Sequence, residues 1–503
     1  MIGRPDPAPK PIVRRRWIVV AGLGFALTAL VVAPLLGLDV SGDLTNTTGR
    51  VTWPILLIGV FAAGCAFWWL LVALPRRLSA WRGAVAGVLT AFFSYPLVLT
   101  LADVIHRDWT NTASWPSLAE RVDSLSVVTV LTLMTSGFAS TLILAVVGAL
   151  MAKLLFGRPP EGWVWQPLGL VQKLAVALAV VIVVGLVGSF VWLSSMSLDL
   201  EELAQRVPPS APAKTYDEAI AAYGAIQAAE ADLPLFDHCR TTLLTHGSKT
   251  ARVVVYFHGF TSCPAQGAAL AAQLFAAGAN VLMPRMVGHG ASDPIAADMT
   301  ELTAAHLVEL AGGSIDMAQG LGDEVLVVGL SAGGTVAAWA AQERADVAYA
   351  LPVSPFFGPY LVATWANRAA INLTLMLPDV TLWWNPLENI GPASPGFGLA
   401  RPTTHALAEI MVLGELVQAI ARTTPPKAGR IDMLLNDADV LVNNSLSEQI
   451  VSLWRGHGKT VGVATLPFSA HLPHDVINPE EHGSDIDLVY SKIDGLVNGA
   501  EPN

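Results

Sequence analysis

One serine stands among residues that suit a nucleophile. Ser331 is the centre of Gly329-Leu330-Ser331-Ala332-Gly333, a Gly-x-Ser-x-Gly pattern. A serine hydroxyl attacks an acyl carbon only when a neighbouring base accepts its proton and N–H groups stabilise the oxyanion that forms. Glycines two residues before and after a serine permit the crowded backbone of a sharp strand-to-helix turn. The pattern therefore predicts an exposed Ser331 hydroxyl with backbone N–H groups beside it, although five residues alone also fit an ordinary turn.

The residues around this pattern predict the elements that would hold the serine. Glu324–Gly329 is mostly apolar and β-branched, which is typical of a strand buried on both faces, and an alanine-rich stretch that predicts a helix follows Ser331. Other short apolar runs, separated by stretches with helical character, lie at 240–245, 253–257, 280–283, 347–352, 431–435 and 461–466. Such alternation predicts a mainly parallel sheet with helices on both faces.

Three motifs follow predicted strands, in the order His258-Gly259-Phe260-Thr261, Pro284-Arg285 with Gly288-His289-Gly290, and Gly329–Gly334. Together they resemble the α/β-hydrolase superfamily, in particular serine esterases and lipases of the bacterial carboxylesterase and monoacylglycerol lipase branch. The resemblance covers about residues 236–500. It implies an α/β-hydrolase fold, an acyl-enzyme mechanism without metal or organic cofactor, and an oxyanion hole made by the backbone N–H groups of Phe260 and Ala332. It also implies that His258 and His289 brace loops rather than react.

The resemblance further implies that a catalytic acid follows the serine in the chain. Two aspartates, Asp437 and Asp439, follow the predicted strand 431–435. Asp439 is the favoured acid because three apolar residues and a helix from about Ser445 come after it, as in the family. Asp437 would then be a solvated turn residue or a cap. Both aspartates stay candidates from the sequence.

The catalytic histidine is implied to follow the acid, and two histidines are placed for that role. His471 and His474 come after the predicted strand 461–466. His474 is favoured because it lies closer to the final helix, predicted to run from 484 or 485 through 496. His471 is the alternative because it begins a His-Leu-Pro-His pattern that is common in the family. A metal site formed by both histidines is disfavoured, because no third and fourth ligand accompany them at useful spacing.

The N-terminal part has a different composition from the rest. The whole chain has a mean hydropathy of +0.52, and 53% of its residues are hydrophobic against 14% charged. Five stretches in the first 195 residues have the length of about 20 apolar residues that crossing a bilayer requires. They lie at 17–36, 53–74, 84–105, 127–151 and 174–194. Residues 1–195 are therefore predicted to form an α-helical bundle of about five transmembrane helices.

Lysines and arginines predict the orientation of this bundle. The N-terminal segment and the loops after the second and fourth stretches hold 11 of them, whereas the opposite loops hold three. Because positively charged loops stay in the cytoplasm, the N-terminus is predicted inside and residues 196–503 outside the cell membrane. That C-terminal part has an excess of 17 acidic residues, which argues against nucleic acid as a partner. Cys239 and Cys263 would pair in an oxidising compartment and stay free in the cytosol.

The sequence therefore predicts three parts. A membrane domain covers 1–195, a linker covers 196–236 and includes a helix from about 215 to 231, and an α/β-hydrolase domain covers 237–503 with a cap insertion at about 353–429. The predicted function is that of a membrane-anchored serine hydrolase that cleaves small-molecule or lipid esters, such as acylglycerols, with membrane lipids as further partners. The alternatives are an acyltransferase or a peptidase on the same triad, and a non-catalytic membrane sensor or scaffold with a hydrolase-like ligand-binding domain.

Overall fold

A computed structural model describes residues 18–29, 53–74, 77–78, 80–106, 138–152, 164–165, 185, 187–206, 210–292, 299–360, 362–381, 402–439, 441–481 and 483–499. By their contacts the residues of the chain form two compact units. The first unit comprises 1–112, 116–195 and 361–370, and the second comprises 113–115, 196–360 and 371–503.

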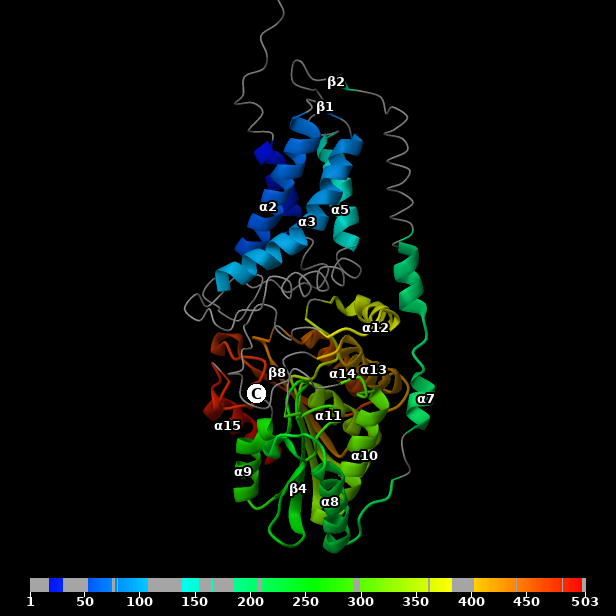
Figure 1. Ribbon diagram of the computed structural model, residues 1–503, viewed down its shortest axis with the longest axis vertical. Coiled ribbons are helices and arrows are strands. Elements are labelled where there is room, and N and C mark those ends of the chain that lie inside the picture. Colours follow the sequence, from blue (N-terminus) through cyan, green and yellow to red (C-terminus); the bar gives the residue numbers. More distant parts are fainter. Residues whose placement is uncertain are drawn as a thin grey trace, which may run out of the picture. The chain divides into compact units, whose positions relative to one another are not determined.

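The second unit is built on one seven-stranded sheet (Figure 1). In spatial order the strands are β3 (Thr242–Leu244), β5 (Asn280–Met283), β4 (Thr250–Phe257), β6 (Gly322–Leu330), β7 (Val347–Val353), β8 (Arg430–Asn436) and β9 (Val461–Leu466). β3 runs antiparallel to β5, and the pairs from β5 through β9 are parallel. The predicted mainly parallel sheet is confirmed, with one antiparallel strand at its edge.

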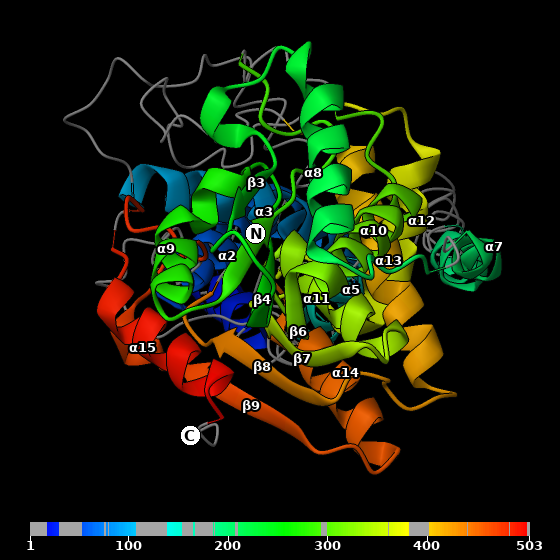
Figure 2. The same cartoon turned by 90° about the horizontal axis from the view of Figure 1, so that it is seen from below.

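Helices cover both faces of this sheet (Figure 2). Along β4, Val253, Val255 and Phe257 belong to one core, whereas Val254 and Tyr256 belong to the other, as the alternation of side chains along a strand requires. The first core is closed by α8 (Tyr216–Ala231), α10 (Ala304–Leu321), α11 (Ala332–Glu343), α13 (Thr404–Ala421) and α14 (Asn444–Gly456), and the second by α9 (Ala268–Ala276) and α15 (Ile486–Val497). Because both faces of the central strands are covered, their middle residues, such as 253–257 and 325–328, form continuous apolar runs in the sequence.

The segment 196–236, for which we expected a linker, contains α7 (Leu200–Gln205) and α8. The Thr215 hydroxyl caps α8 by accepting from the Glu218 N–H, at the place that the sequence indicated. α8 packs closely on α10, since a side chain on Gly320 would collide with the Thr215 carbonyl oxygen. Residues of this segment are therefore part of the second unit.

The predicted cap insertion contains two kinds of structure. α13 packs against α11, and its Ile410, Leu413 and Val417 lie in the core of the sheet, so this helix is a regular covering helix. Before it come the short helix η7 (Thr364–Ala366) and α12 (Asn367–Met376). Residues 382–401 lie outside the described residues.

The first unit holds apolar helices. They are residues 18–29, α2 (Trp53–Trp68) with its π-helical continuation η1 (Trp69–Ala73), α3 (Ala80–His106) and α5 (Phe138–Leu150), and two short strands, β1 (Arg77–Leu78) and β2 (Val164–Trp165), pair in parallel. α3 and α5 approach closely, because a side chain on Gly87 would collide with the Leu144 carbonyl oxygen. Small residues at such a contact are typical of helix pairs within membranes.

Two described helices are long and apolar enough to cross a membrane, Pro54–Ala73 and Thr404–Ala421. The second of these is α13, which belongs to the core of the sheet. Of the five predicted spans, the second coincides with α2 and η1 and the third with α3. The first, fourth and fifth fall partly outside the described residues. The bundle of five therefore stays a prediction.

Candidate active site

Ser331 lies on a strained turn between β6 and α11. Its backbone has φ 57° and ψ −114°, a conformation that residues with side chains rarely adopt. Three hydrogen bonds hold it there: its N–H donates to Val353 O at 2.9 Å, and its carbonyl accepts from the Thr335 and Phe356 N–H groups, both at 3.0 Å. Ser331 as a whole residue is only 4% exposed, so the turn is less open than we expected. The loop that follows β4 packs over this turn.

Two glycines make this packing possible. A side chain on Gly333 would collide with the carbonyl oxygens of Phe257 and His258, and one on Gly329 would collide with the Gly333 carbonyl. A Cβ on Gly259 would lie 3.7 Å from the Ser331 Cβ. The turn that carries Ala332 is therefore in contact with the loop that carries Phe260, where we expected the two oxyanion donors.

Asp439 and His474 meet at the ends of neighbouring strands β8 and β9. His474 Nδ1 lies 2.5 Å from Asp439 Oδ2. The other carboxylate oxygen, Oδ1, accepts from the N–H groups of Leu441 at 2.8 Å and Val442 at 3.3 Å. The turn after β8 thus fixes the Asp439 carboxylate, and the carboxylate fixes the imidazole.

The Asp439 contact leaves one nitrogen of His474 able to accept a proton. With its Nδ1–H donated to Asp439, the neutral ring has Nε2 free to accept a proton. Burial disfavours the charged ring, but the negative charge of Asp439 and its hydrogen bond, with the charges of Asp475 and Glu481, outweigh burial and raise the pKa of His474. In the described residues no hydrogen bond joins Ser331 to His474, and such bonds often form only when substrate is present.

The two alternative candidates, His471 and Asp437, lie in the same loops as His474 and Asp439. His471 ends the short helix η8 (Phe468–Ala470) in a left-handed conformation with φ 48°, and its ring packs 5.4 Å from that of Phe468. The Asp437 N–H donates to Leu466 O, and burial raises the pKa of the Asp437 carboxyl. In the same two loops, Asp439 and His474 are joined by a hydrogen bond.

His258 braces the loop of residues 258–263, here called the 258–263 loop. Its Nδ1 lies 2.9 Å from Gly259 O and its Nε2 accepts from the Met286 N–H at 3.1 Å. One nitrogen donates and the other accepts, so the ring is neutral. Burial, with the neighbouring His289 and Arg285, holds the pKa of His258 well below its ordinary value. The ring therefore joins this loop to the loop after β5.

His289 has a similar environment. It is fully buried, its Nδ1 lies 2.9 Å from Val287 O, and its ring centre is 5.0 Å from that of His258. Burial is the main cause that lowers the pKa of His289 to about 4. Neither His258 nor His289 has a carboxylate as hydrogen-bond partner among the described contacts, in contrast to His474.

A disulfide ties the 258–263 loop from its other end. Cys263 is bonded to Cys239, which ends the short helix η5 (Asp237–Cys239), and both cysteines are fully buried. The sequence had left this pairing open, because spacing alone does not show which compartment the cysteines face.

One side chain of the site was missed by our reading of the sequence. Gln266, in the short helix η6 (Pro264–Gly267), accepts a hydrogen bond from the Gly259 N–H at 2.7 Å and donates to Asp475 Oδ2 at 2.9 Å. Asp475 directly follows His474. Gly259 and Asp475 are 216 positions apart, and a lone glutamine in a short helix carries no chemical signature.

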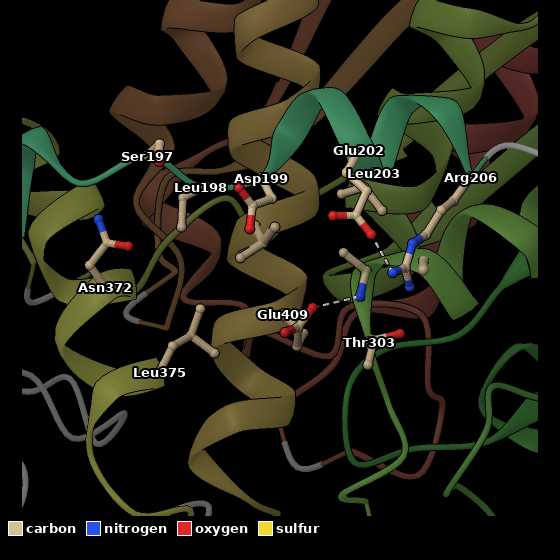
Figure 3. A pocket seen from close by; sticks show the side chains of 13 residues that line it. Ser197, Leu198, Asp199, Glu202, Leu203, Arg206, Thr303, Asn372, Leu375 and Glu409 are labelled. Carbon is tan, nitrogen blue, oxygen red and sulfur yellow. Dashed lines mark hydrogen bonds and ion pairs between the residues drawn. The ribbon is translucent and has the colours of Figure 1, made fainter.

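A separate pocket of about 380 Å³ lies in the same unit (Figure 3). The residues that line it come from Ser197–Arg206, the start of α10, and helices α12 and α13. Glu409 accepts from the Ala304 N–H at 2.8 Å, and Arg206 pairs with Glu202 at 2.5 Å. No residue of the Ser331 site lines this pocket. Within the described ranges no group of three or more His, Cys, Asp or Glu side chains could hold a metal ion.

Comparison with known proteins gives one family match. Residues 248–425 match the family model described as serine aminopeptidase, S33. No curated protein matches the chain.

Several solved structures resemble part of the chain. One is described as "LipS and LipT, two metagenome-derived lipolytic enzymes", with 20% identity, coverage of 52% of this chain and 99% of that chain, and a TM-score of 0.40. A monoacylglycerol lipase of Paleococcus ferrophilus has 16% identity, coverage of 52% and 99%, and a TM-score of 0.39. A soluble variant of monoglyceride lipase from Saccharomyces cerevisiae has 12% identity, coverage of 52% and 91%, and a TM-score of 0.39. With the strand order and the Ser331 turn described above, the family match shows that the second unit has the α/β-hydrolase fold.

Proposed function

We propose that the protein is a membrane-anchored serine hydrolase that cleaves carboxylic esters through an acyl-enzyme. The observation that carries this proposal is the hydrogen bond between Asp439 and His474 at the same sheet edge as the strained Ser331 turn. A nucleophile, a base and an orienting carboxylate are the three groups that acyl transfer by serine requires.

Each group has one role in the first half of the reaction. Ser331 Oγ attacks the ester carbonyl carbon while His474 Nε2 takes the hydroxyl proton, and Asp439 stabilises the imidazolium. The Phe260 and Ala332 N–H groups bind the oxyanion, and loss of one such donor raises the barrier by about 2.7–4 kcal/mol. The C–O bond to the alcohol then breaks, the alcohol leaves with the proton from His474, and the acyl group stays on Ser331.

Water completes the cycle. His474 takes a proton from water, the resulting hydroxide attacks the acyl carbon, and the bond to Ser331 Oγ breaks as the serine regains a proton from His474. The products are one carboxylic acid and one alcohol, and the enzyme returns to its initial state.

The membrane anchor and the location of the catalytic domain are part of the proposal. The five apolar stretches and the unequal distribution of lysine and arginine support a catalytic domain outside the cytoplasmic membrane. The buried Cys239–Cys263 disulfide is compatible with an oxidising compartment. An anchored enzyme meets substrates that are confined to the bilayer, which favours acylglycerols or other lipid-like esters.

A fluorophosphonate probe tests the chemistry on the full chain in detergent. We expect covalent labelling of the wild type and no labelling of Ser331→Ala, with Ser354→Ala, a serine at the end of the neighbouring strand, as the matched control that keeps its label. An unlabelled wild type with a cooperative unfolding transition would favour a non-catalytic sensor. Hydrolysis of p-nitrophenyl esters of increasing chain length then tests the substrate class, and equal rates for all lengths would contradict a lipid-like substrate.

A peptidase is the second candidate, because the family model that matches residues 248–425 is described as a serine aminopeptidase. The same triad could release an amine in place of an alcohol. Aminoacyl p-nitroanilides distinguish the two: cleavage of anilides without cleavage of esters would replace the esterase by a peptidase.

A further inference from the structure

The Gln266 side chain lies between the two halves of the candidate site. It is 4% exposed and makes three polar contacts. Its Oε1 accepts from the Gly259 N–H at 2.7 Å and from the Tyr256 hydroxyl at 3.2 Å, and its Nε2 donates to Asp475 Oδ2 at 2.9 Å. One buried amide therefore connects the 258–263 loop with the loop that carries the histidine.

The chemistry of the partners fixes the orientation of this amide. A backbone N–H can only donate, so the Gln266 oxygen must face Gly259. The amide nitrogen then faces Asp475, whose carboxylate can accept. If the amide were rotated by half a turn, its nitrogen would face the Gly259 N–H and its oxygen would face the Asp475 carboxylate. Neither of these two hydrogen bonds could then form. The orientation is thus set by all of its partners together.

Gln266 contacts two residues that are each adjacent in the chain to a group of the proposed reaction. Gly259 precedes Phe260, a proposed oxyanion donor, and packs against Ser331. Asp475 follows His474, the proposed base. The Asp475 carboxylate also accepts through Oδ1 from the Asn478 N–H at 3.3 Å, which holds it in the histidine loop.

We propose that Gln266 and Asp475 are positioning residues that hold the 258–263 loop and the His474 loop in one arrangement, and that the Asp475 carboxylate is a second negative charge that stabilises the His474 imidazolium. This inference rests on the proposed function, since it assigns His474 the role of base. It adds a second carboxylate to the site.

The charged and titratable groups around this pair agree with that role. Asp439, Asp475 and Glu481 face His474, and each favours its charged form. Around Asp475 itself, burial is the largest effect and raises the carboxyl pKa, and the Gln266 hydrogen bond and the His474 charge offset only part of that rise. Tyr256 and Tyr490, the other titratable groups close to Asp475, have raised pKa values, chiefly through burial, and stay neutral. Asp475 and Glu481 both belong to the loop after β9, which also carries His474.

Asp475→Asn is the decisive variant because it keeps the shape and an oxygen that can accept from Gln266. For p-nitrophenyl ester hydrolysis by the full chain, kcat/KM should fall at low pH as His474 becomes protonated; we call this fall the acid limb. We expect it to move to lower pH by about one unit when the Asp475 charge is removed. Glu480→Gln removes an exposed charge from the same loop and is the matched control, with an acid limb at the wild-type pH. An unchanged acid limb in Asp475→Asn would overturn the charge role.

Gln266→Met tests the positioning role. It keeps the length of the side chain but removes the acceptor for the Gly259 N–H, so we expect kcat to fall about 10- to 100-fold with little change in KM, because oxyanion stabilisation acts in the transition state. A wild-type kcat in a folded Gln266→Met protein would overturn this role. If Gln266→Met does not fold, Asp475→Leu, which removes the acceptor for the Gln266 amide, tests the positioning role, and a wild-type kcat in that variant would overturn it.

Failure of the inference can be told apart from failure of the proposed function. If the wild type neither cleaves esters nor reacts with a fluorophosphonate, the proposed function fails. The His474 titration can then still be followed by NMR of the full chain with ¹³C-labelled histidine. A shift of its midpoint to lower pH in Asp475→Asn but not in Glu480→Gln supports the inference, and equal midpoints in all three proteins contradict it.

Discussion

The two halves of the candidate site are held by different forces. On the serine side, Ser331 and the 258–263 loop are fixed by backbone hydrogen bonds, close glycine contacts and a disulfide, and His258 and His289 are neutral rings with lowered pKa values. On the acid–histidine side, His474 is hydrogen-bonded to the Asp439 carboxylate, and the charges of Asp439, Asp475 and Glu481 raise its pKa. Negative charge thus lies on the side where the proposed mechanism moves a proton, whereas the serine side is fixed by its backbone contacts.

This contrast predicts that loss of a charge on the acid–histidine side affects rate far more than folding. Asp439→Asn keeps the shape of the side chain but no longer holds His474 in the tautomer with a free Nε2. We expect kcat to fall about 10⁴-fold while the unfolding transition stays close to that of the wild type. Ester hydrolysis and thermal unfolding of the same preparations measure both.

Asp437→Asn is the matched control for that experiment, since Asp437 lies two residues away in the same turn. We expect its kcat to stay within about threefold of the wild type. A larger loss in Asp437→Asn than in Asp439→Asn would mean that the two aspartates exchange roles in the working enzyme.

The serine side is expected to respond to acid through stability. His289 has a folded pKa of about 4 against an ordinary value of 6.5, so the unfolded chain binds its proton more readily than the folded chain. This group therefore contributes stability that is fully present above pH 6.5 and is lost as the pH falls toward 4, by about 3 kcal/mol at most. His258, whose pKa is also lowered, adds to the same loss.

Urea unfolding of the full chain in detergent at pH 7 and pH 4.5 measures this loss. His289→Asn keeps a donor for Val287 O without a titrating ring, and we expect its stability to depend less on pH over this interval than that of the wild type. Identical pH dependence in both proteins would show that His289 does not carry the acid sensitivity.

The same contrast explains how much of the fold was visible in the sequence. β5 and β9 begin and end at the residues predicted for them, because each is a short, mostly apolar run with turn residues at its ends. β4 begins three residues earlier than predicted, at Thr250, because pairing with β6 extends the strand through polar residues. Local pattern therefore locates elements, and pairing with neighbours decides their ends.

The site was visible to different degrees on its two sides. The turn of Ser331 needs glycines at fixed positions, so it leaves a motif in the sequence. Asp439 and His474 are held by side-chain contacts between separate loops, and the sequence could reduce the choice only to two residues each. Gln266 and Asp475 left no pattern, because their hydrogen bond joins residues 209 positions apart.

The smallest predicted effect concerns the pH at which His474 gains its proton. Only the neutral ring can accept the Ser331 proton, and the carboxylates around it raise its pKa, so the acid limb of fluorophosphonate labelling is expected at a pH above about 6.5. Glu481→Gln removes one of these charges and is expected to move the limb down by less than one unit, whereas Glu480→Gln leaves it in place. A wild-type limb below 6.5 would mean that burial of the ring outweighs its carboxylates. Burial would then be the dominant influence on the pKa of His474, as it is for His258 and His289 on the serine side.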